Sequence, residues 1–195
     1  MLMQRKLLLI YFLAIRFLAV AQTDFYTRLS EAALQLTKQA VVYDPSYFTI
    51  DYPNGDIPQG KGVCTDVVIR AYRKLGIDLQ KEVHLDMKSN FDKYPKNWGL
   101  KKPDTNIDHR RVPNLMVFFS RFGTKKPITQ NADDYQPGDI VCWNLGGSIT
   151  HIGIVVNKKS VVGNRFMVVH NIGGGQVLED CLFNYTIIGH YNYRK

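Results

Sequence analysis

Hydrophobic residues in the first part of the chain recur at helical spacing. An amphipathic helix is predicted over residues 25–40, and the same spacing predicts further helices over residues 64–75, 81–91 and 114–122. The apolar side chains near one face of the first helix are Phe25, Leu29, Ala32, Leu36 and Ala40. Residues 93–113 are rich in helix breakers, and a loop of that length in a compact domain is commonly functional.

From Pro137 onward the pattern changes to short β-strands separated by tight turns. The predicted strands cover residues 138–144, 151–156, 165–170, 176–178 and 186–193. Consecutive short strands joined by tight turns indicate an antiparallel sheet. Helices come first and the sheet second, so the predicted class is α+β. No internal repeat or domain boundary is visible.

Composition and charge agree with one globular domain. The chain has 195 residues, of which 45% are hydrophobic and 22% are charged. The formal net charge is +8, but the sequence contains no arginine-rich run and no aromatic-basic repeat. We therefore expect no nucleic-acid partner, whereas an anionic polymer or an acidic small substrate is compatible with the charge.

The N-terminus has the pattern of a cleaved signal peptide. Arg5 and Lys6 precede an apolar run, Leu7–Val20, and Ala19–Ala21 has the small-x-small form of a cleavage site. The alternative is an uncleaved anchor, but the run is shorter than the roughly 20 residues of a spanning helix. We predict removal of residues 1–21 and export to the periplasm or the extracellular space, with no stable membrane span afterwards.

The cysteine count is odd. An exported protein with three cysteines leaves at least one thiol outside any intramolecular disulfide. Cys142 and Cys181 are able to pair and leave Cys64 free, but the sequence does not decide this. Cys142 lies in the buried-strand pattern Asp139–Trp143, which favours core packing.

Cys64 lies where a turn-rich loop meets a predicted helix. Unpaired backbone N–H groups and the positive end of the helix dipole converge at a helix N-terminus. That environment favours the thiolate, the reactive form of cysteine, and predicts that Cys64 is a catalytic nucleophile. The alternative is a small buried residue that packs a helix end.

A nucleophilic cysteine needs a base, and the base needs an orienting partner. His151 begins a predicted strand after a glycine turn, and His170 ends the next one, so the two are expected near one end of a hairpin. We predict that His151 is the base and His170 its orienting partner. Asn171 is the rival for the second role, because adjacent strand residues face opposite sides, and it is also expected among the substrate-binding residues. No metal-ligand spacing such as C-x-x-C is present, and we expect no metal and no cofactor.

Four motifs together resemble the NlpC-type branch of the papain-like cysteine peptidases. They are the loop-Cys64-helix unit, Gln136–Val141, His151–Val155 and Val168–His170. The resemblance implies N-terminal helices packed on a C-terminal antiparallel sheet, and cleavage of peptide bonds in bacterial cell-wall stem peptides. In that family a tyrosine upstream of the cysteine lines the site, and Tyr52 is the residue that the resemblance assigns to this place.

The match covers roughly residues 52–193, with an insert at about residues 81–135. Val63–Asp66 departs from the family's usual D-C-S-G. Asn106–Asn114, together with the Cys64 motif, resembles a more specific branch, domain-of-unknown-function family 1287.

The insert carries two adjacent arginines. Arg110 and Arg111 are predicted to bind carboxylates of an acidic stem peptide through bidentate contacts. The alternative is a solvated or loop-pinning charge run. Asp66 lies close to the proposed thiolate, and we expect it to point away, toward Arg70.

The sequence thus predicts one papain-like catalytic domain over residues 22–195, an exported cysteine amidase or endopeptidase. Its expected substrate is a peptidoglycan stem peptide, and we expect a monomer. A second hypothesis is a binding module of the same fold with an inactive site, which holds cell-wall glycan or peptide. A third is a papain-like acyl hydrolase or transferase that acts on another substrate.

Overall fold

A computed structural model describes residues 25–195, so the predicted signal peptide lies outside the described residues. Residues 25–36 are helical, which ends the first helix earlier than predicted. The elements that follow are β1 (Val42–Tyr43), β2 (Lys61–Gly62), α2 (Cys64–Lys74), α3 (Leu79–Asn90), α4 (Val112–Phe122), β3 (Thr124–Lys125), β4 (Ile140–Asn144), β5 (Thr150–Lys159), β6 (Phe166–His170), β7 (Val177–Glu179) and β8 (Thr186–Asn192). No helix among residues 25–195 is long and apolar enough to cross a membrane.

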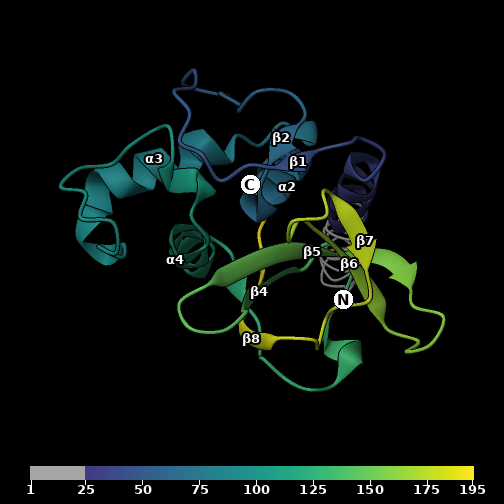
Figure 1. The fold of residues 1–195 in the computed structure, drawn as a ribbon. Coiled ribbons are helices and arrows are strands. Elements are labelled where there is room, and N and C mark those ends of the chain that lie inside the picture. The colour runs from purple at the N-terminus through teal and green to yellow at the C-terminus, as the bar shows by residue number, and fades with distance from the viewer. Residues whose placement is uncertain (1–24) are drawn as a thin grey trace, which may run out of the picture.

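The main sheet has the strand order β3-β8-β4-β5-β6-β7, and every neighbouring pair is antiparallel. The helices lie to one side of this sheet, with α2 and α3 above it in Figure 1. The predicted α+β class is therefore confirmed. The last strand does not extend the sheet beyond β7, because β8 pairs with β4 on one side and with β3 on the other.

Strand β4 separates two hydrophobic clusters. Ile140 and Cys142 belong to the cluster under the helices, whereas Val141 and Trp143 belong to the smaller cluster on the opposite face. Cys181 is in the smaller cluster, so the sheet lies between it and Cys142. All three cysteines are free, and the suggested Cys142–Cys181 pair is not formed.

Helix α2 packs directly on the main sheet. Its apolar face, which includes Val67, Val68 and Ala71, is fully buried, and the helix contacts β5. The helix starts where Val63 is extended and the Asp66 carboxylate accepts the Val63 N–H at 2.7 Å. It ends before Gly76, whose φ of 81° is in the left-handed region that favours glycine.

The aromatic run after the first helix is mostly irregular. Only Val42–Tyr43 forms a strand, β1, which pairs in parallel with β2 and places Tyr43 opposite Gly62. This short pairing brings Tyr43 beside the loop that leads into Cys64. The predicted irregular segment before α4 contains 3-10 turns at Phe91–Lys93 and Asp108–Arg110.

Candidate active site

Cys64 is the first residue of α2, and its sulfur faces three backbone N–H groups. They belong to Cys64 itself, to Thr65 and to Ile152 of β5, and each lowers the pKa of the thiol. The first two come from the open end of the helix, as the sequence predicts. The third comes from the residue that follows His151, so the helix start packs against the strand that carries the proposed base.

Burial has a larger effect on Cys64 than these hydrogen bonds. The side chain is 6% exposed, and removal from water, with a smaller contribution from Asp66, raises the pKa of the thiol from 9.0 to about 12. The thiol is therefore neutral at rest. The helix start lowers the pKa of the thiol, as the sequence predicts, but burial outweighs this effect, and the depth of burial cannot be read from the local sequence.

His151 and His170 are joined by a hydrogen bond. His151 Nε2 and His170 Nδ1 lie 2.8 Å apart, and both side chains are buried. Gly153 leaves room for this approach: a Cβ added there would lie 2.6 Å from Val168 Cγ1 and 3.1 Å from His170 Cβ. A larger residue at position 153 would clash with β6, which explains the glycine in the His151–Val155 motif.

Glu179 of β7 extends this chain of hydrogen bonds. Its Oε2 lies 3.1 Å from His170 Nε2, and its side chain is 50% exposed. An ionised carboxylate only accepts, so His170 carries its proton on Nε2 and accepts at Nδ1. His151 must then donate from Nε2, which leaves His151 Nδ1 as the basic nitrogen.

Both histidines are neutral at rest. Burial, followed by the neighbouring His170, lowers the pKa of His151 from 6.5 to about 3. Burial also lowers the pKa of His170, although Glu179 opposes that shift. His151 Nδ1 makes no hydrogen bond with any residue in the range 25–195, and none joins His151 to the Cys64 sulfur there.

Asn171 is not the orienting residue. It is fully buried, and its Nδ2 donates to the Gly62 carbonyl at 3.2 Å, while its Oδ1 accepts the Gly173 N–H at 3.1 Å. The side chain therefore holds the loop before Cys64 in place. The expectation that Asn171 binds substrate or orients His151 is wrong, because both ends of its amide are engaged elsewhere.

Arg110 is also a structural residue. Its guanidinium makes two hydrogen bonds to the Asp66 carboxylate, at 2.9 and 3.1 Å, and both side chains are almost fully buried. Arg110 also lines the Cys64 cavity, but this ion pair engages its guanidinium, which leaves Arg111 as the better candidate to bind a substrate carboxylate. The expected Asp66–Arg70 contact is wrong, since Arg70 binds Asp56 at 3.0 Å.

A cavity of about 210 Å³ has Cys64 in its wall. Tyr43, Trp98, Arg111 and Thr150 also line it. The Arg111 guanidinium lies 4.0 Å from the centre of the Trp98 ring and 3.5 Å from an Asp108 carboxylate oxygen. These contacts hold Arg111 at the wall of the cavity. The sequence predicts that Arg111 binds a substrate carboxylate.

Tyr43 takes the place that the family resemblance gave to Tyr52. Tyr52 is 41% exposed, packs on His84 with ring centroids 5.0 Å apart, and is absent from the Cys64 cavity wall. Burial raises the pKa of Tyr43, and the next cause is the charge of Cys64, which places the two groups close together. The pairing of β1 with β2 brings Tyr43 to this cavity, a long-range contact that spacing from Cys64 does not reveal.

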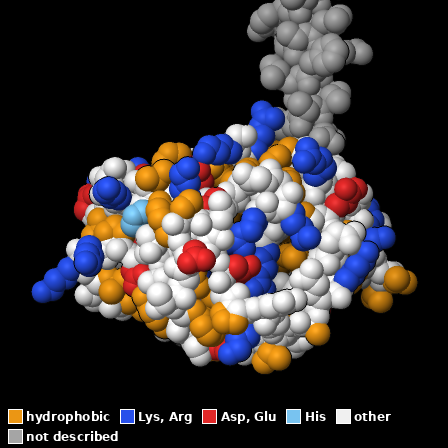
Figure 2. Space-filling view, turned by 90° about the horizontal axis from the view of Figure 1, so that it is seen from above, with side chains coloured by type: hydrophobic (Ala, Val, Ile, Leu, Met, Phe, Trp, Pro, Cys, Tyr) orange, Lys and Arg blue, Asp and Glu red, His pale blue; other side chains and the backbone are white. Residues whose placement is uncertain are grey.

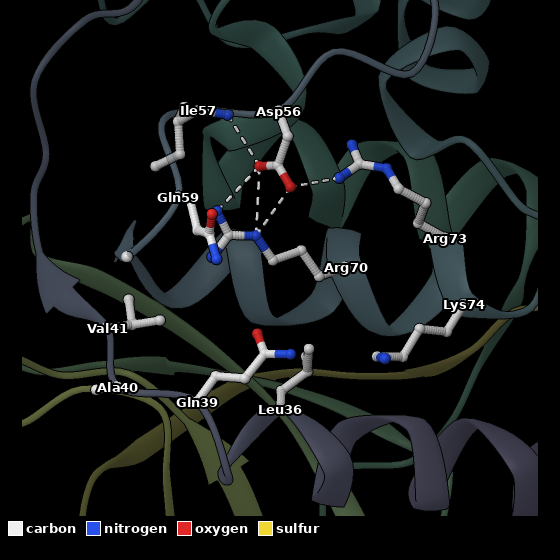
Figure 3. Close-up of a pocket in the computed structure, with 11 residues that line it drawn as sticks. Leu36, Gln39, Ala40, Val41, Asp56, Ile57, Gln59, Arg70, Arg73 and Lys74 are labelled. Carbon is white, nitrogen blue, oxygen red and sulfur yellow. Dashed lines mark hydrogen bonds and ion pairs between the residues drawn. The ribbon is translucent and has the colours of Figure 1, made fainter.

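A larger cavity lies elsewhere, between the first helix, α2 and the loop before β2. It measures about 910 Å³, and Arg70, Arg73 and Lys74 line it, as Figure 3 shows. Asp56 binds Arg70 at 3.0 Å and Arg73 at 2.7 Å, so two of these cations are already paired. Lys and Arg side chains outnumber Asp and Glu on the face seen in Figure 2.

The chain is similar to one protein family and to one curated protein. Residues 30–193 match the family described as domain of unknown function DUF1287. The chain is 50% identical over 172 residues to the uncharacterised protein YijF of Escherichia coli strain K12, which covers 88% of this chain and 83% of YijF.

Two solved structures are similar at low sequence identity. NlpC1 from Trichomonas vaginalis is 14% identical, with a TM-score of 0.44 over 85% of this chain and 44% of that chain. An N-acetylmuramoyl-L-alanine amidase from Bacteroides uniformis is 12% identical, with a TM-score of 0.49 over 87% of this chain and 99% of that chain.

Proposed function

We propose that this chain, which belongs to the DUF1287 family, is a papain-like cysteine amidase or endopeptidase. Cys64 is the nucleophile, His151 the base and His170 the group that orients the base. One observation carries the proposal: the sulfur at the start of α2 meets the Ile152 N–H, beside a histidine whose far nitrogen is already bound by a second histidine at 2.8 Å.

The reaction starts from a neutral thiol and a neutral imidazole. When an amide carbonyl enters the cavity, the sulfur attacks the carbonyl carbon and the thiol proton moves to His151 Nδ1. The backbone N–H groups at the start of α2 donate to the oxygen that becomes negative. His151 Nδ1 then protonates the departing amine, the C–N bond breaks, and a thioester remains on Cys64.

Water completes the cycle. His151 Nδ1 takes a proton from water, the hydroxide attacks the thioester carbon, and the C–S bond breaks. The products are a carboxylic acid and the regenerated thiol. Throughout these steps the imidazolium is stabilised through Nε2 by His170 and, beyond it, by the Glu179 carboxylate.

Proton transfer requires the Cys64 sulfur and His151 Nδ1 to come within hydrogen-bond distance. No hydrogen bond joins the Cys64 sulfur to His151 among residues 25–195. Catalytic hydrogen bonds are often long or misaligned without substrate and tighten in the complex. Rotation of the Cys64 thiol or of the His151 ring, on substrate binding, brings the sulfur and Nδ1 together.

We propose a stem peptide of the bacterial cell wall as substrate. Arg111 at the Cys64 cavity suits a carboxylate. The N-terminal signal pattern supports export to the compartment that holds this polymer. The family resemblance of the four motifs supports the same substrate class.

An inactive binding module of the same fold is the second candidate. The absence of a Cys64–His151 hydrogen bond within the described residues and the neutral thiol both favour it. The two candidates differ in whether a covalent bond is cut.

The test is digestion of purified cell-wall fragments, with the new chain ends identified by mass spectrometry. We expect one amide bond of the stem peptide to be cut by the wild type and left intact by Cys64→Ala. Tight binding of uncut fragments by both proteins would support the inactive module. Cleavage of a different amide or ester, but of no stem peptide, would assign the enzyme to another substrate.

A further inference from the structure

Three potential metal ligands meet at the β6–β7 edge of the sheet, behind the proposed catalytic pair. They are His170 Nε2, a Glu179 carboxylate oxygen and Cys181 Sγ, which all lie within 4.8 Å of one another. Glu179 Oε2 is 3.1 Å and Cys181 Sγ is 3.4 Å from His170 Nε2. Glu179 faces Val168 across the hairpin, which puts its side chain on the same side of the sheet as His170.

The two separations measured from His170 Nε2 are close to those around a tetrahedral zinc ion. Zinc is bound at about 2.0–2.1 Å by histidine nitrogen, at about 2.0–2.2 Å by carboxylate oxygen and at about 2.3 Å by thiolate. Tetrahedral angles then put nitrogen and oxygen about 3.3 Å apart, and nitrogen and sulfur about 3.6 Å apart. The observed 3.1 and 3.4 Å are each within a few tenths of an ångström of these values.

The position of the ion follows from the nitrogen that both partners share. Glu179 and Cys181 approach the same nitrogen, Nε2, so an ion between them takes the place of the Nε2 proton. Glu179 is 50% exposed, whereas Cys181 is buried, so the ion reaches the site from the Glu179 side. A water molecule there completes the four ligands.

We propose that His170, Glu179 and Cys181 form a binding site for Zn²⁺ or a similar borderline-soft divalent cation, and that the bound ion switches the active site off. No short ligand-spacing motif predicts this site, because the β6–β7 hairpin brings the ligands together. The switch, but not the binding site, rests on the proposed function.

The switch works by reversing one hydrogen bond. With Nε2 bound to the metal, a neutral His170 carries its proton on Nδ1 and donates it to His151 Nε2. His151 then carries its own proton on Nδ1 and is unable to accept the Cys64 proton. Each histidine carries one proton before and after the metal binds, on Nε2 before and on Nδ1 after. The Cys181 thiol releases one proton to solvent when it binds the metal.

Binding is tested first in a Cys64→Ser background, which removes the nucleophile as a competing ligand. We expect calorimetry to show one Zn²⁺ per chain, and Co²⁺ to give a thiolate charge-transfer band. Cys181→Ser should abolish that band, while the matched control Cys142→Ser should keep it, because Cys142 lies on the other face of the sheet. Glu179→Gln should weaken Zn²⁺ binding roughly tenfold or more.

Cys181 is buried, so Cys181→Ser can lose Zn²⁺ binding through a folding defect. Glu179→Gln changes a half-exposed residue and keeps the shape of the side chain, so it tests the same site without that risk. The absence of stoichiometric Zn²⁺ binding would overturn the proposal. So would Zn²⁺ affinity that is equal in the parent protein, in Cys181→Ser and in Glu179→Gln.

The switch is tested on hydrolysis by the protein with Cys64 intact. We expect Zn²⁺ to inhibit wild-type hydrolysis, a chelator to restore it, and Cys181→Ser to remain active in the same Zn²⁺. Inhibition that persists undiminished in Cys181→Ser would overturn the switch. If the metal-free protein hydrolyses nothing but still binds one Zn²⁺ through Cys181, the proposed function fails and the metal site stands.

Discussion

His170 lies between His151 and Glu179, with His151 Nε2 2.8 Å from His170 Nδ1. The Glu179 carboxylate at 3.1 Å from His170 Nε2 sets the direction of both hydrogen bonds. The basic lone pair is therefore placed on His151 Nδ1, the nitrogen that no other described group binds. The Cys64 sulfur accepts the N–H of Ile152, the residue that follows His151 in β5.

Loss of His170 should affect turnover more than substrate binding. We expect His170→Ala to lower kcat by about 10²–10⁴-fold, because His151 loses its orienting partner and its tautomer is no longer set. KM should change little, since His170 is buried behind His151. His170→Asn, which also offers a hydrogen-bond acceptor, should recover part of kcat. Equal kcat in wild type and His170→Ala would contradict the orienting role.

Arg111 is expected to select acidic substrates. Arg111→Ala should raise KM for a stem peptide with a free carboxylate by about tenfold, the loss of roughly 1.4 kcal/mol that a charge-assisted contact supplies. The same variant should not change KM for the matching peptide amide. Steady-state kinetics with the two peptides gives both values. An unchanged KM for the acidic peptide would remove Arg111 from the substrate site.

The arginine pair also shows what a sequence pattern leaves open. Arg110 and Arg111 are adjacent and chemically identical, and the loop that carries them was expected to be functional. Both arginines line the Cys64 cavity, but Arg110 is buried in an ion pair with Asp66, whereas Arg111 is more exposed. Packing between the insert and α2 decides which of the two arginines is buried. This long-range contact cannot be predicted from the residues around the pair.

Arg110 should instead be essential for stability. Arg110→Ala leaves the Asp66 carboxylate buried without its partner, and we expect a loss of about 3–5 kcal/mol in the free energy of unfolding. Denaturant titration followed by circular dichroism measures it. Arg121→Ala is the matched control, because its ion pair with Asp86 is more exposed. A loss below that of the control would contradict the assignment.

Other parts of the site were visible in the sequence because local patterns determine them. The turn-rich loop, the apolar face of α2 and Gly76 together placed Cys64 at a helix start. Glycine turns placed His151 and His170 near one end of the sheet. The sequence did not predict Tyr43, Trp98 or Glu179 as site residues. Each reaches the site through a long-range contact, which residue spacing does not predict.

Two buried histidines should make the fold sensitive to acid. Burial is the main reason that the pKa values of His109 and His151 fall from 6.5 to about 3. Between these values the unfolded chain binds protons that the folded chain does not, so stability is full above pH 6.5 and falls as pH drops toward 3. Each histidine contributes at most about 1.4 kcal/mol per pH unit in this window.

Denaturant titrations across this pH range measure the effect. His109→Gln removes one titrating group that lies outside the proposed catalytic set and should make the pH dependence less steep. Stability that stays constant across the range in the wild type would contradict the burial of neutral histidines.

Selective labelling tests the central claim most directly. The protein is treated with iodoacetamide or an epoxide inhibitor near neutral pH, and the modified cysteine is identified by peptide mass spectrometry. We expect modification at Cys64 alone, at a rate that His151→Ala strongly reduces, although all three thiols are buried. Equal labelling of Cys64, Cys142 and Cys181, or a rate at Cys64 that His151→Ala leaves unchanged, would contradict a catalytic Cys64–His151 pair.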